Sequence, residues 1–89
     1  MAEEEIPENL IVLQQRFDAA HAAVVAASRR PGAVATWPPE AVEDLQRLQA
    51  AELAAVMELY RARVGTPFER YEHVKRLQEA AREGGGTAR

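Results

Sequence analysis

Apolar residues recur at alternating spacings of four and three over the first third of the chain. They are Ile6, Leu10, Leu13, Phe17, Ala20, Val24 and Ala27. This heptad pattern is typical of a helix that packs one stripe against a partner helix. Pro7 suits the first turn of such a helix, and Pro31-Gly32 would end it. The pattern therefore predicts a helix over residues 7–29 that needs a helical neighbour.

A second apolar pattern covers residues 39–64 and is broader than the first. Its members are Val42, Leu45, Leu48, Leu53, Val56, Met57, Leu59, Tyr60 and Val64. At 100° per residue these side chains spread over about half of a helix circumference. One neighbouring helix needs a narrower stripe. We therefore expect this second helix to contact two partners.

The segment Thr66-Pro67-Phe68-Glu69 has the features of a helix start, because threonine suits the N-cap and glutamate three residues later completes a capping box. Gly65 before it is suited to ending the second helix. The third helix is predicted over residues 67–82, with most of its surface charged. Its apolar stripe consists of Tyr71, Val74, Leu77 and Ala81.

These elements predict an all-α fold. The two long helices, joined by a short loop, form an antiparallel hairpin, and the short third helix covers part of the remaining apolar surface. Residues 6–83 make one domain between a mobile acidic N-terminus, residues 1–5, and a mobile Gly-rich tail, residues 84–89. Because the second helix has a wide apolar face, we expect a homodimer that forms a four-helix-type bundle. A monomeric three-helix bundle is the rival arrangement.

Composition limits the chemistry. The 89 residues include no cysteine, so disulfides, thiolate metal sites and thiol nucleophiles are excluded, and Ser28 is the only serine. No apolar run approaches the roughly 20 residues that span a bilayer, and the acidic N-terminus is unlike a signal peptide. We expect a cytoplasmic location and no membrane partner. Ten arginines against one lysine favour a GC-rich bacterial origin, and eighteen alanines favour closely packed helices.

The interface candidates are the large apolar residues of the two long helices. They are Leu10, Leu13, Phe17, Val24, Leu45, Leu48, Leu53, Val56 and Tyr60. Four polar residues, His21, Gln49, Glu52 and Arg63, lie within or beside these apolar faces. A buried charged group is costly unless it is paired, so we interpret these four as polar seam residues that specify register, or as positions at the rim of the apolar face. In that interpretation Glu52 meets His21 or an arginine of a neighbouring helix.

A catalytic interpretation of the same residues is the weaker alternative. Asp18 and His21, three residues apart, could present two ligands to one metal, and Glu52 of the facing helix could add a third. The paired Glu-x-x-His motif of helical metal sites is absent, however. We therefore expect no cofactor, no metal and no enzymatic activity. The second alternative is a metal or small-molecule enzyme that uses His21 and Glu52.

Charge is distributed unevenly along the chain. The net charge is −4 over residues 1–28 and +1 over residues 29–89, which together give −3. Arg70, Lys75 and Arg76 on the third helix allow a DNA-binding interpretation, in which the second and third helices form a helix-turn-helix. Acidic residues on that same helix would repel phosphate. They are Glu69, Glu72, Glu79 and Glu83.

The sequence thus favours a small non-enzymatic protein–protein interaction module, acting as a homodimer, in the role of an adaptor, assembly factor or regulator. Its expected partners are a second copy of the chain and another protein. A DNA-binding regulator is the alternative, and it is disfavoured by the acidic balance of the chain.

Overall fold

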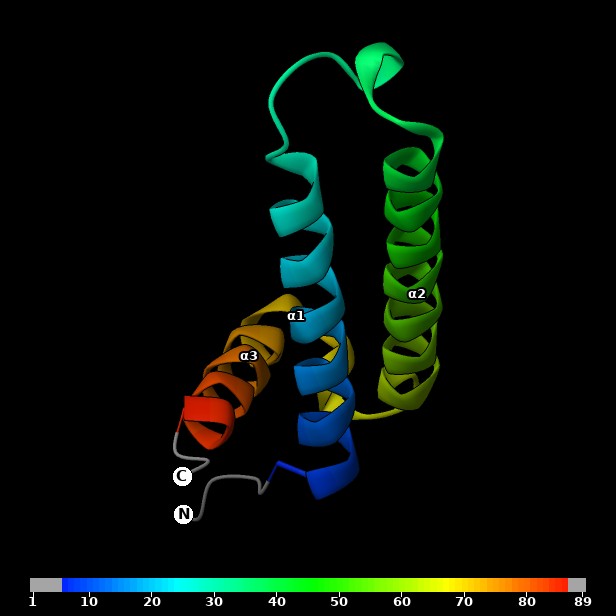
Figure 1. Ribbon diagram of the computed structural model, residues 1–89. Helices are drawn as coiled ribbons and strands as arrows, with labels where there is room; N and C mark the ends of the chain where they lie inside the picture. Colours follow the sequence, from blue (N-terminus) through cyan, green and yellow to red (C-terminus); the bar gives the residue numbers. More distant parts are fainter. Residues whose placement is uncertain (1–5, 87–89) are drawn as a thin grey trace.

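The part of the chain that the structure describes forms three α-helices and two short 3₁₀ helices (Figure 1). The computed structural model describes residues 6–86, with side chains as far as residue 83. In chain order the elements are α1 (Glu8–Ser28), η1 (Val34–Thr36), α2 (Pro39–Arg63), η2 (Pro67–Glu69) and α3 (Tyr71–Gly86). The described residues contain no strand, which confirms the predicted all-α class. None of their helices combines the length and apolar character needed to cross a membrane.

The helices α1 and α2 lie side by side and antiparallel, as the heptad pattern predicts (Figure 1). Leu10 of α1 and Leu45 and Leu59 of α2 are buried, while Leu13 and Phe17 are half-buried. Each helix ends within one residue of its predicted bounds. The long hairpin is therefore held by contacts within one chain, which accounts for the apolar seam on α1.

The connection between α1 and α2 is closed by Trp37. Its indole Nε1 donates a hydrogen bond to the carbonyl oxygen of Gly32 at 3.2 Å, and the side chain is buried. Gly32 has a φ of +89°, which favours glycine, and η1 then returns the chain to α2. Pro39 is in the first turn of α2, where its missing N–H leaves no hydrogen bond unmade.

The prediction that the third helix begins at residue 67 is wrong. Thr66 does cap a helix, since its hydroxyl oxygen accepts from the backbone N–H of Phe68, but that helix is the three-residue η2. Arg70 then has extended backbone, and α3 starts at Tyr71. In a helix continuous from residue 67, Phe68 would lie about 120° around the helix from Val74 and would point away from the core. The break lets both side chains be buried.

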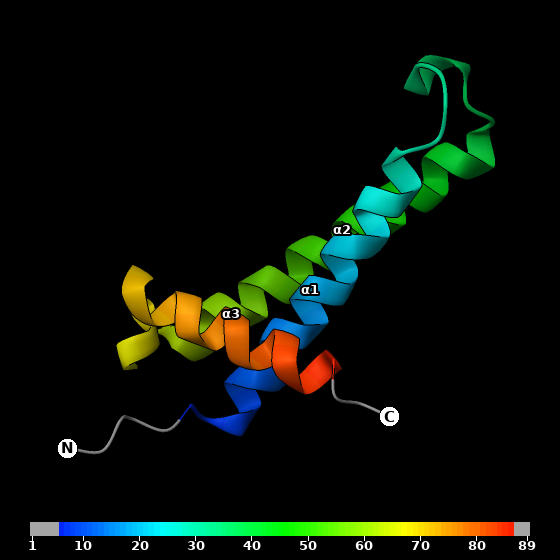
Figure 2. The same cartoon turned by 90° about the vertical axis from the view of Figure 1, so that its left-hand side faces the viewer.

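The core lies where α3 crosses the lower half of α1, at one end of the hairpin (Figure 2). It is built from one side chain of each contributing element: Leu10 of α1, Leu59 of α2, Phe68 of η2 and Leu77 of α3. The carboxamide of Gln15 ties the two crossing helices together by donating to the carbonyl oxygen of Ala81 at 3.2 Å. The third helix therefore packs on α1.

At the C-terminal end, α3 is longer than the sequence predicts. The predicted end of the third helix at residue 82 is wrong, because α3 continues through Gly86, while the mobility of residues 84–89 stays a prediction. Glycine can take helical φ and ψ, and no proline follows to stop the helix. Residues 87–89 and the predicted acidic segment 1–5 lie outside the described residues.

Candidate interaction surface

One face of α2 presents four large apolar side chains to solvent. Leu53, Met57, Tyr60 and Val64 are 45–65 % exposed. The first three lie in α2 and Val64 is its C-cap residue, and their spacings of four, three and four place them on one side. We call these four residues the α2 stripe. The buried Leu59 belongs to the side of α2 that packs on α1. The wide apolar arc of α2 is thus divided into a covered part and an uncovered part.

The nine apolar interface candidates divide in the same way. Leu10 and Leu45 are buried, and Leu13, Phe17, Val24, Leu48 and Val56 are half-buried, whereas Leu53 and Tyr60 are exposed. The sequence could not separate the groups, because periodicity shows how wide an apolar face is and not which part of it a neighbour covers. Met57 and Val64 are exposed with Leu53 and Tyr60, and both belong to the apolar pattern of residues 39–64, although they were not among the interface candidates.

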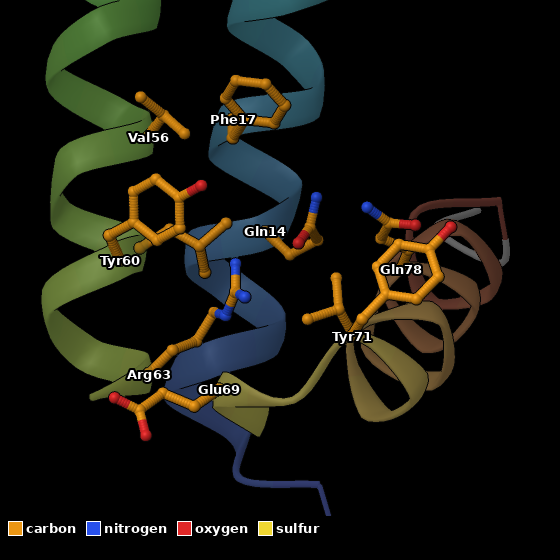
Figure 3. Close-up of a pocket in the computed structure, with 10 residues that line it drawn as sticks. Gln14, Phe17, Val56, Tyr60, Arg63, Glu69, Tyr71 and Gln78 are labelled. Atoms are coloured by element: carbon orange, nitrogen blue, oxygen red, sulfur yellow. The ribbon is translucent and has the colours of Figure 1, made fainter. Parts of the chain in front are cut away.

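A groove of about 310 Å³ adjoins the α2 stripe (Figure 3). It exists because α2 and α3 both pack on α1 but make few direct contacts with each other. We call this space the groove. Tyr60 belongs both to its wall and to the α2 stripe. The groove is lined by Gln14 and Phe17 of α1; Val56, Leu59, Tyr60 and Arg63 of α2; Glu69 of η2; and Tyr71, Val74 and Gln78 of α3.

Arg63, predicted as a polar seam residue, lies in the groove. Its Nε donates to the carbonyl oxygen of Phe68 at 2.8 Å, and its guanidinium carbon lies 5.1 Å from the centre of the Tyr60 ring. A hydrogen bond and a cation–π contact therefore fix the side chain at the turn between α2 and η2. The guanidinium points into the groove rather than away from the protein (Figure 3).

His21 and Glu52 meet, as the polar seam interpretation allows. His21 Nδ1 lies 2.6 Å from Glu52 Oε2, across the α1–α2 seam, and the imidazole stacks on Phe17 with ring centres 5.8 Å apart. The His21 side chain is more than half exposed. Within the part of the chain that the structure describes, no three potential metal ligands are grouped. Asp18 instead accepts a hydrogen bond from Gln14 at 2.9 Å.

Two glutamines depart from the expected pattern. Gln49, predicted as a seam or rim residue, is exposed and lies one helical turn before Leu53. Gln14, which the sequence did not single out, is 2 % exposed beneath the groove. The only signal in the sequence was its position four residues after Leu10 and three before Phe17, which places it on the same helix face as both. A glutamine is ordinarily assigned to the surface all the same.

The three basic residues of the DNA-binding interpretation are not gathered on one face. Arg70 lies in the extended link before α3 and is exposed, as is Lys75. Arg76 is half-buried, with Nη1 3.2 Å from His73 Nδ1 and its guanidinium 5.9 Å from the centre of the Phe68 ring. The segment between α2 and α3 holds η2, so the two helices are not joined by a simple tight turn.

Together, the fold and this surface describe a helical hairpin with a third helix across one end, and with an apolar stripe and groove open to solvent. Comparisons of the chain with protein-family models, with curated proteins and with solved structures found no match.

Proposed function

We propose that this protein is a small, non-enzymatic helical interaction module that acts as a homodimer through the α2 stripe. The observation that carries the proposal is the exposure of Leu53, Met57, Tyr60 and Val64 on one side of α2. Singly exposed apolar residues are common on monomers, but a row at heptad spacing is the pattern that pairs helices. In this proposal the chain then presents its helix faces to another protein as an adaptor, assembly factor or regulator.

The exposed apolar area supplies about three quarters of what one partner contributes to a standard interface. At about 200 Å² for a large side chain, the stripe together with Tyr71, which is 79 % exposed, offers roughly 600 Å². A standard interface takes about 800 Å² from each partner. Tyrosine and methionine, both present here, are enriched at interface centres, where burying them contributes much of the affinity.

Sedimentation equilibrium over roughly a hundredfold range of concentration tests the proposal. We expect a monomer–dimer equilibrium, and we expect Leu53→Glu to shift it strongly toward monomer because a charge would lie in the interface. The matched control is Ala54→Glu, which puts the same charge on the next residue, also exposed but outside the stripe. A wild-type chain that stays monomeric at every concentration, or a dimer that Leu53→Glu leaves intact, would contradict the proposal.

A further inference from the structure

Two opposite charges line the groove without meeting each other. Arg63 and Glu69 both lie on its wall, at the end where α2 turns into η2. The guanidinium of Arg63 points into the groove, whereas the carboxylate of Glu69 points away from its centre (Figure 3). Among the described residues, neither side chain forms an ion pair.

Arg63 has more hydrogen-bonding capacity than its contact with Phe68 uses. Its Nε donates to Phe68, while the two terminal nitrogens carry four further N–H donors. The side chain is half-buried, so part of its hydration has been removed. The cation–π contact with Tyr60 and the bond to Phe68 hold the guanidinium in place, which limits the entropy lost when an anion binds. The groove therefore offers a positioned cation beside apolar walls.

We propose that the groove receives a second copy of this chain, with Arg63 paired to Glu69 of the partner subunit and Glu69 paired to Arg63 of the partner subunit. This inference rests on the homodimer proposed above and specifies its geometry. In a two-fold dimer the same patch occurs on both sides, so a contact from residue i to residue j is repeated from j to i. A patch with one positioned cation and one carboxylate, both without a partner charge among the described residues, is complementary to itself.

The α2 stripe gives this pairing an apolar setting. Tyr60 belongs to both surfaces, so a partner seated on the groove also reaches Met57 and Val64. Tyr71 projects from the opposite wall (Figure 3). The apolar contacts supply most of the binding free energy, while the two charge pairs set orientation and register.

Charge reversal tests the pairing. Arg63→Glu and Glu69→Arg each place like charges opposite one another twice in the homodimer. Like charges brought together at an interface oppose binding, so we expect each variant to dimerise at least about a hundredfold more weakly. Mixing the two variants makes both pairs attractive again and should restore a dimer of near wild-type affinity, as should the double variant. Glu72→Arg is the matched control, since it makes the same charge change on an exposed residue outside the groove.

The outcomes separate this inference from the proposed function. If the wild type dimerises and both single variants dimerise with the same affinity, the groove pairing is overturned and the homodimer stands. The same follows if mixing the two variants does not restore the dimer affinity. A wild-type monomer would overturn both. Arg63→Glu also loses the bond to Phe68, so circular dichroism must show that it folds. If Arg63→Glu does not fold, Glu69→Arg decides alone, because Glu69 is exposed and its substitution should leave the fold intact. A Glu69→Arg dimer as tight as the wild-type dimer would then refute the pairing.

Discussion

Two leucines six residues apart on α2 are expected to respond very differently to the same substitution. Leu59 is 3 % exposed and belongs to the core with Leu10, Phe68 and Leu77, whereas Leu53 is 59 % exposed on the α2 stripe. Replacing either by alanine removes the same three carbon atoms. The comparison therefore measures what burial contributes at each position, with helix and chemistry held constant.

For Leu59→Ala, three buried carbon groups at about 0.8 kcal/mol each give about 2.4 kcal/mol of lost transfer free energy. The cavity left in the core raises the expected loss to about 3–4 kcal/mol. At 0.05–0.15 kcal/mol per residue, 89 residues give a total stability of about 4–13 kcal/mol, so this loss is a large fraction. For a domain of this size the Tm falls by about 4–8 °C for each kcal/mol of stability lost. We therefore expect the Tm of Leu59→Ala to lie at least about 12 °C below that of the wild type.

For Leu53→Ala, only about two fifths of the side chain is covered, so we expect a loss of about 1 kcal/mol and no cavity term. Thermal and urea unfolding followed by circular dichroism measure both variants, at concentrations low enough to keep the chain monomeric. Equal destabilisation by the two substitutions there would refute the assignment of Leu53 to an uncovered face and with it the division of α2.

Two further predictions concern the turn between α2 and α3. Thr66→Ala removes a hydroxyl that accepts from Phe68 N–H at 3.1 Å and donates to the Arg63 carbonyl at 2.7 Å, and should cost about 1–2 kcal/mol in urea unfolding. Thr66→Ser should keep most of that stability, and an unchanged Thr66→Ala midpoint would speak against the cap. Gly65 has a φ of +79°, and a Cβ at this position would meet no atom within 4 Å, so Gly65→Ala should cost about 1 kcal/mol from backbone strain alone. Gly65→Asn should cost less, because asparagine tolerates this conformation, and equal losses for the two variants would argue against a left-handed residue here.

Local signals in the sequence located the long helices. The heptad spacing on residues 6–27 identified α1, and Pro31, Pro39 and Gly65 bounded α1 and α2 to within a residue, because helix-ending and helix-starting residues act over a single turn. The same reasoning allowed His21 to meet Glu52, since an antiparallel pairing of two helices brings their polar seam positions together. Nothing beyond one hairpin was needed for these inferences.

The third helix shows where such reasoning stops. Thr66, Pro67 and Glu69 have the chemistry of a helix start, and a short helix does start there. Its length was set by the core: Phe68 and Val74 cannot point the same way on one continuous helix, so the chain becomes extended at Arg70. Tyr71, expected on the apolar stripe with Val74 and Leu77, is exposed at the first position of α3.

The sequence by itself determined that the chain makes three helices, that two of them pair, and that α2 has more apolar surface than one neighbour covers. Only the tertiary structure decided that α3 packs across α1, because the direction of a helix after a turn depends on which buried contacts the whole chain can make together. That choice leaves the α2 stripe exposed. It also places Arg63 and Glu69 in one groove, an arrangement that no spacing along the chain encodes.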